Sequence, residues 1–181
     1  QAKMRAKQAD FSVCVFVAAG ISSAPFESAW KKANCPFKIE KTPFLPQEEF
    51  DSFILDMDFL FVRGEDSLAR ACLSGIPFVW QAYVQDENYQ LVKVNALLER
   101  MKPFFDAADF SLINTFWNQF NDASLDKGTG LDSTLLSRLL YASYTSDTTP
   151  PSLKNSFRTF SERLIQNGDL TQKLLAYMDS L

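Results

Sequence analysis

Residues 63–67, Arg-Gly-Glu-Asp-Ser, have the residue types and the setting of an anion-binding turn. They follow an apolar run at 59–62 that is typical of a buried strand, and they open a stretch of helix formers that ends at Gly75. A strand, a sharp turn and a helix N-terminus direct backbone N–H groups and the positive end of the helix dipole at one point. Arg63 adds a cation and Ser67 a hydroxyl. The sequence therefore predicts a phosphate site, with an ordinary capped βα turn as the alternative.

The absence of histidine limits the chemistry of the whole chain, since none of the 181 residues is His. Ser-His and Cys-His nucleophilic catalysis and histidine metal sites are excluded at once. The sequence also has no Cys-x-x-Cys pair, which makes a structural zinc site improbable. Acid–base chemistry must use carboxylates, lysine, tyrosine or cysteine.

Composition and charge indicate a globular cytoplasmic protein. The chain is 46% hydrophobic and 22% charged, which is enough to bury a core within one domain. Its net charge of −4 argues against a nucleic-acid-binding surface. No apolar run approaches the roughly 20 residues that a membrane span needs. We expect the three cysteines, Cys14, Cys35 and Cys72, to be reduced, buried thiols.

Hydrophobic periodicity divides the chain into an α/β part and a helical part. Predicted strands at 11–17, 37–41, 59–62 and 76–81 alternate with predicted helices at 23–34, 46–57, 65–75 and 88–101. This alternation predicts a parallel sheet with helices on both faces. Four further helices with aromatic stripes are predicted at 106–121, 131–144, 151–166 and 169–181. We assign 1–105 to a core and 106–181 to a helical segment completing the same domain.

The loops after the four strands carry the most specific motifs, and in parallel α/β sheets ligands bind beyond these strand ends. Pro-Phe-Leu-Pro-Gln stands at 43–47, Arg-Gly-Glu-Asp-Ser at 63–67 and Pro-Phe-Val-Trp at 77–80, with Arg70, Tyr83, Gln85 and Lys93 nearby. In this order and spacing, the motifs resemble the protein-arginine rhamnosyltransferases that modify elongation factor P. The resemblance is strong over about 11–101.

This resemblance implies a GT-B glycosyltransferase built from two Rossmann-like halves. The chain corresponds to the C-terminal half, which holds dTDP-β-L-rhamnose, while the inverting attack comes from an arginine of elongation factor P. Neither a metal nor a cofactor is implied. The family's catalytic aspartates lie in the N-terminal half, so we expect this chain to bind donor weakly and to transfer nothing alone. Residues 1–8 also resemble the tail of a helix whose start is absent, which favours a fragment.

The resemblance assigns roles to the turn at 63–67. Arg63 offers a planar fork of hydrogen-bond donors to a pyrophosphate oxygen. Arg63 and Glu65 are the two residues of this chain that the resemblance assigns to catalysis. Gly64, which breaks the apolar run, is also assigned to the donor-binding residues. The backbone N–H groups of Glu65, Asp66 and Ser67, with the Ser67 hydroxyl, suit the same negative charge. The two carboxylates would instead accept from sugar hydroxyls, orient the acceptor or cap the helix.

A second group of residues is expected to hold the thymine of the donor. By resemblance, Phe44 provides an aromatic wall, Gln47 pairs with the base edge, and Phe16 is a second aromatic; core packing is the alternative for both phenylalanines. Two departures from the family pattern are expected to weaken donor binding. Ala18 replaces a tyrosine, and Gln90 replaces a histidine.

Two alternatives to this function remain open. In the first, the chain is the donor domain for another nucleotide sugar, and UDP would then outcompete dTDP. In the second, it is a non-catalytic module that binds a partner through its helices. In GT-B enzymes a terminal helix often crosses to the other half, so residues 169–181 are expected to expose an apolar face and to promote self-association.

Overall fold

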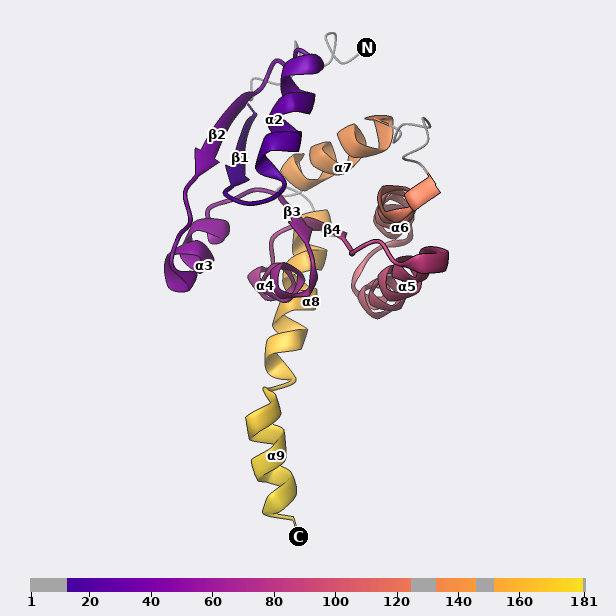
Figure 1. Ribbon diagram of the computed structural model, residues 1–181. Coiled ribbons are helices and arrows are strands. Elements are labelled where there is room, and N and C mark those ends of the chain that lie inside the picture. Colours follow the sequence, from indigo (N-terminus) through magenta and orange to yellow (C-terminus); the bar gives the residue numbers. More distant parts are fainter. Residues whose placement is uncertain (1–12, 125–132, 146–151, 181) are drawn as a thin grey trace. The chain divides into compact units, whose positions relative to one another are not determined.

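The computed structural model describes residues 13–124, 133–145 and 152–180 (Figure 1). These three stretches are the described ranges of the chain. The predicted helix tail at 1–8 and the first residues of the strand predicted at 11–17 lie outside them. The chain divides into two compact units, Gln1–Phe50 and Asp51–Leu181, and each is described by itself.

The first unit contains a pair of parallel strands and a helix. Its elements are β1 (Cys14–Ala18), α2 (Ser23–Lys32), β2 (Lys38–Thr42) and the first residues of α3 (Gln47–Leu55). The turn between β1 and α2 is closed by Ser23, whose Oγ accepts from Gly20 N at 3.0 Å and lies 3.1 Å from the Ala18 carbonyl. All four elements agree in type with the sequence prediction and differ from it at the ends by a few residues.

The prediction that the first strand is buried is wrong for most of its length. In β1 only Val17 is buried, and none of the residues Ser23–Lys32 of α2 is fully buried. Successive side chains of a strand point to opposite faces, and among the described residues β1 has one hydrogen-bonded neighbour, β2. The apolar composition of the strand reports its β-propensity, which does not determine how many layers cover it.

The second unit holds another parallel strand pair and the helices. Its elements are β3 (Leu60–Arg63), α4 (Glu65–Ser74), β4 (Phe78–Gln81), the 3₁₀ turn η1 (Asp86–Asn88), α5 (Tyr89–Met101), the 3₁₀ turn η2 (Lys102–Phe104), α6 (Ala107–Asn121), α7 (Ser133–Thr145), α8 (Leu153–Gln166) and α9 (Leu170–Met178). The predicted α/β class, with parallel strands and a helical C-terminal segment, is confirmed. Within the described ranges the strands form two hydrogen-bonded pairs, β1–β2 and β3–β4.

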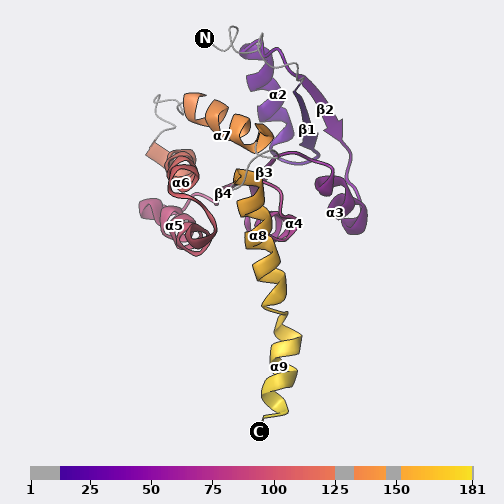
Figure 2. The same ribbon diagram turned by 180° about the vertical axis from the view of Figure 1, so that it is seen from behind.

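One aromatic core joins the strands of the second unit to its helices. Phe78 of β4 lies with its ring centroid 5.3 Å from that of Trp117 on α6 and 5.3 Å from that of Phe157 on α8. Helix α4 packs against α8, where Ser161 Oγ donates to the Leu73 carbonyl at 2.8 Å. Figures 1 and 2 show α5 and α6 side by side. The helices therefore support β4, which pairs with β3, and α4, which follows the turn at 63–67.

The cysteines agree only in part with the expectation of buried thiols. All three are free, but Cys14 is exposed and Cys35 is half-buried. Cys72, on α4, is buried, and desolvation raises its pKa to about 12. A thiol with this pKa is protonated at neutral pH, so Cys72 is a packing residue and no nucleophile.

The last helix, α9, exposes an apolar face, as the sequence predicts. Leu170, Leu174 and Tyr177 are all exposed, and both views show α9 continuing beyond α8 (Figures 1 and 2). Large exposed apolar side chains on one helix are typical of a surface that another molecule covers.

We therefore expect the chain to self-associate at high concentration. Replacing Leu170 and Leu174 together by lysine should shift it toward a monomer in light scattering, because the substitutions place two charges in the exposed apolar surface of α9. Lys173→Gln, which changes an exposed residue of the same helix and keeps the leucines, serves as the control. A monomeric wild-type chain across the concentration series would contradict this prediction.

Candidate functional site

Gly64 gives the turn between β3 and α4 its shape. Its φ of +78° and ψ of 176° lie in a region that other residues rarely adopt. Its N–H donates to the Gln81 carbonyl at 3.2 Å, and its carbonyl accepts from Trp80 Nε1 at 3.1 Å and Leu68 N at 3.2 Å. The Gly64 N–H is thus used within the fold. The glycine acts by fixing the turn and is no anion donor itself.

The N-terminus of α4 has no side-chain cap, unlike those of α6, α8 and α9. Asp106 caps α6, Ser152 caps α8 and Asp169 caps α9, each through its side chain. The N-cap residue of α4 is Gly64, which has no side chain to accept from the first N–H groups. An α-helix leaves these first donors without intrahelical acceptors, and here they belong to residues 65–67. They are available to an anion, and the helix dipole favours one.

Arg63 lies beside this open helix end and is held by a tyrosine. Its guanidinium carbon lies 5.3 Å from the ring centroid of Tyr83, which is a cation–π contact. Within residues 13–124, 133–145 and 152–180, no carboxylate lies within ion-pair distance of Arg63. The charge of Arg63 is therefore oriented and available. Sequence reasoning did not assign Tyr83 to the site, although its place in the loop after β4 could have indicated it.

The two acidic residues of the turn are each next to a cation. Glu65 Oε1 lies 3.5 Å from Lys93 Nζ, and Asp66 Oδ2 lies 3.3 Å from Arg70 Nε. Arg70 also forms an ion pair with Asp51, and the hydrogen bond with Asp51 is the main reason that the pKa of Arg70 is raised. These cations reduce the repulsion that the two carboxylates would exert on a phosphate. Exposed pairs of this kind add little to stability.

The predicted base-binding residues belong to the first unit. Phe16 is on β1 and is 39% exposed, while Phe44 follows β2 and is 84% exposed. Gln47 is the first residue of α3 and is also exposed. The alternative that Phe44 packs in the core is therefore wrong. Its exposed ring is free to stack on a planar ligand.

Gln90, which replaces a histidine of the family pattern, lies inside the protein. Its side chain is fully buried. Its Oε1 accepts from Gln85 N at 3.0 Å, and its Nε2 donates to the Asn121 carbonyl at 3.1 Å. All of its polar atoms have partners inside the protein, so Gln90 supports the loop after β4 from within. Ala18, the other departure, is the exposed last residue of β1.

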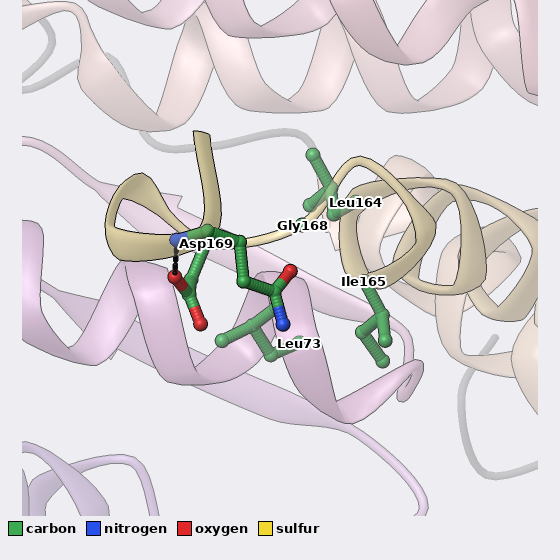
Figure 3. A pocket seen from close by; sticks show the side chains of 6 residues that line it. Leu73, Leu164, Ile165, Gly168 and Asp169 are labelled. Carbon is green, nitrogen blue, oxygen red and sulfur yellow. Dashed lines mark hydrogen bonds between the residues drawn. The ribbon is translucent and has the colours of Figure 1, made fainter. Parts of the chain in front are cut away.

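A hollow in the second unit lies at the other end of α4 from the turn. It has a volume of about 440 Å³ and lies between α4, α8 and the start of α9 (Figure 3). Leu73, Leu164 and Ile165 make it largely apolar, and the Asp169 carboxylate accepts from Gln172 N at 2.8 Å. The six residues that line the hollow include an acidic side chain and no cation, so the hollow does not suit a phosphate.

The described ranges contain neither a membrane-spanning helix nor a cluster of metal ligands. No helix in them is long and apolar enough to cross a bilayer. No three His, Cys, Asp or Glu side chains in the same ranges come together as ligands for a metal ion.

Comparison with known proteins agrees with the resemblance seen in the loops. The family model described as elongation factor P (EF-P) rhamnosyltransferase EarP matches residues 4–179. A protein-arginine rhamnosyltransferase of Neisseria meningitidis serogroup B is 43% identical over 68 residues, which are 38% of this chain and 18% of the relative. One of Pseudomonas putida is 39% identical over 84 residues, which are 46% of this chain and 22% of the relative.

A solved structure shares the fold. It was reported as the structural basis for EarP-mediated arginine glycosylation of translation elongation factor EF-P. The match has a TM-score of 0.70 at 23% identity and covers 96% of this chain and 54% of the solved one. The chain thus spans about half the length of that protein, and its family is the one that the loop motifs predicted. The match over nearly the whole chain shows that it belongs to the EarP family of EF-P rhamnosyltransferases.

Proposed function

We propose that this chain is the donor-binding half of a GT-B glycosyltransferase that transfers rhamnose from dTDP-β-L-rhamnose to an arginine of elongation factor P. The family match and the names of the curated relatives support the transferase class. The observation that carries the donor assignment is Arg63, a cation without an acidic partner among the described residues, next to the open N-terminus of α4. A pyrophosphate is the part of a nucleotide sugar that such a site suits.

In the proposed reaction, an arginine nitrogen of the acceptor attacks the anomeric carbon from the face opposite the phosphate. The bond from this carbon to the phosphate oxygen breaks, the configuration inverts, and dTDP leaves with the bonding electron pair. Arg63 and the N–H groups of residues 65–67 stabilise the charge that develops on the leaving group. This arrangement needs no metal ion. Glu65, kept in place by Lys93, lies near the sugar and orients it or the acceptor guanidinium.

The proton released from the acceptor arginine goes to a general base that we place outside these 181 residues. We assign this base to the N-terminal half of the enzyme, which closes the active site over the donor. Since the acceptor is a translation factor, the reaction takes place in the cytoplasm. The chain by itself is expected to bind the donor and not to transfer rhamnose.

The base of the donor is proposed to lie against Phe44 and Phe16, with Gln47 bonding its edge. The exposure of Phe44 and Gln47 supports this role, because neither side chain is engaged in the core. Stacking of a base on an aromatic side chain contributes about 1–3 kcal/mol. Thymine differs from uracil by a methyl group, and the thymine and uracil edges offer the same hydrogen-bonding groups.

Titration calorimetry with dTDP and UDP tests this assignment. We expect dTDP to bind more tightly than UDP. Phe44→Ala should weaken dTDP binding by about tenfold, because it removes the stacking surface. Gln47→Ala should weaken both nucleotides equally, since it removes a hydrogen bond that both can form.

Leu55→Ala, which shortens an exposed side chain at the far end of α3, is the control and should change neither affinity. Tighter binding of UDP would favour a different nucleotide sugar as the donor. If neither nucleotide binds at millimolar concentration, the donor-binding assignment is wrong and the non-catalytic alternative is favoured.

A further inference from the structure

The loop at 82–85, which carries Tyr83, is held at both ends by buried side-chain amides. Asn121, the last residue of α6, is 4% exposed, and Gln90 of α5 is 0% exposed. Both residues are polar, and both lie among the apolar residues that pack α5 on α6 and α6 on β4. Buried amides are tolerated only where their hydrogen bonds are made, so each has a specific structural task.

Asn121 holds the first end of the loop. Its Oδ1 accepts from Ala82 N at 2.8 Å, and its Nδ2 donates to the Trp80 carbonyl at 2.8 Å and the Trp117 carbonyl at 2.9 Å. The amide fits in one orientation only, since the flipped group would set its oxygen against two carbonyl oxygens. Asn121 therefore continues the hydrogen bonding of β4 past its last residue and ties it to α6.

Gln90 holds the second end of the loop and is bonded to the first amide. Its Oε1 accepts from Gln85 N at 3.0 Å, and its Nε2 donates to Asn88 Oδ1 at 3.1 Å and to the Asn121 carbonyl at 3.1 Å. Between these contacts the backbone is strained, with φ of +56° at Glu87 and +58° at Asn88. Two successive residues in this region persist only where their surroundings fix them.

The residue between these anchors is the one that supports Arg63. The Tyr83 ring lies under the guanidinium, and its Oη is 2.7 Å from the point that a Cβ on Gly64 would occupy. The ring thus covers the turn closely, although about half of it is exposed. Since the ring is not enclosed by the core, its position depends on the backbone of the loop.

We propose that Asn121 and Gln90 are positioning residues for donor binding. They fix the backbone of residues 82–85, so that Tyr83 lies against Gly64 and holds the Arg63 guanidinium toward the open end of α4. In this way buried amides on α5 and α6 set the geometry of the anion site through the loop. The consequence for binding rests on the proposed function, whereas the consequence for Arg63 can be measured without any ligand.

The binding test uses Asn121→Ala in the 181-residue chain, with dTDP as the probe. We expect the dissociation constant to rise about tenfold, as for the loss of one well-placed charge-assisted hydrogen bond, with an unchanged stoichiometry. A loss of folded protein alone would lower the stoichiometry and leave the dissociation constant as it is. In a Tyr83→Ala background the same substitution should cause no further loss of affinity, because Asn121 acts through Tyr83.

Ser161→Ala is the matched control. It removes a partly buried hydrogen bond of similar length, from Ser161 Oγ to the Leu73 carbonyl, in the same unit and away from the loop. It should lower the melting temperature without changing dTDP affinity. An equal loss of affinity in the control, or an undiminished loss in the Tyr83→Ala background, would overturn the proposal.

A ligand-free measurement separates this inference from the proposed function. Protons of Arg63 that lie over the Tyr83 ring should have upfield NMR shifts in the wild type. Gln90→Ala, a second variant in case Asn121→Ala does not fold, should return these shifts to random-coil values, and Ser161→Ala should keep them. If the shifts behave so and dTDP does not bind, the positioning holds and the donor assignment fails. If Gln90→Ala leaves the shifts unchanged, the positioning role is refuted.

Discussion

Replacing Arg63 by alanine is expected to weaken dTDP binding by between about tenfold and about 100-fold, the equivalent of a charge-assisted hydrogen bond to an anion. The side chain is the one cation at the turn, among the described residues, that has no carboxylate partner, since Lys93 is next to Glu65 and Arg70 bonds Asp51. Its removal leaves the N–H groups of residues 65–67 as the main support of the pyrophosphate. Calorimetric titration at two salt concentrations measures both the loss and the smaller salt dependence that should accompany it.

Two further variants show which property of Arg63 matters. Arg63→Lys keeps the charge but lacks the planar fork and stacks less well on Tyr83, so its affinity should be intermediate. Arg100→Ala removes an exposed arginine in the last turn of α5 and should bind dTDP like the wild type. Equal affinities for Arg63→Ala and wild type would show that the pyrophosphate, if it binds, binds elsewhere.

The order and type of the elements could be predicted because each rests on local signals. Alternating apolar stretches and the glycine at 64 marked the strand, turn and helix around the site, and Gly75 does end α4 in a left-handed conformation. The same signals located the helices after residue 106. Local hydrogen bonding and side-chain periodicity largely determine where helices and strands form, so one sequence was sufficient to predict their order and type.

The residues that complete the site were harder to predict because their contacts are distant in sequence. Asn121 bonds Ala82 across 39 positions, and its type and place at the end of a helix suggest only a cap. Gln90 stands where the family pattern has a histidine, which predicts weaker donor binding, but the sequence does not indicate that its side chain is a buried support of the loop. Composition also overestimated burial at β1 and at Cys14, since propensity does not report which neighbours cover a strand.

Gly64→Ala should reduce both the stability of the chain and its affinity for dTDP. A backbone at φ +78° and ψ 176° is strained for any residue with a Cβ, and such strain costs on the order of 1–3 kcal/mol. The new methyl group would also lie 2.7 Å from Tyr83 Oη. Since Tyr83 is half exposed, its ring can swing aside, and Arg63 then loses its support. Thermal unfolding and titration with dTDP measure the two losses separately.

Two comparisons separate the strain from the displaced ring. Gly75→Ala also places a methyl group at positive φ, +72°, but its nearest atom is Arg158 Cα at 3.4 Å, far along α4 from the turn. It should lower the melting temperature and leave dTDP affinity unchanged. In the double variant Gly64→Ala/Tyr83→Ala the clash is absent, so affinity should match that of Tyr83→Ala alone. The Tyr83 ring cannot keep its place beside the added methyl group. If Gly64→Ala nevertheless bound dTDP as tightly as the wild type, the contact of Tyr83 with the turn would have no part in binding.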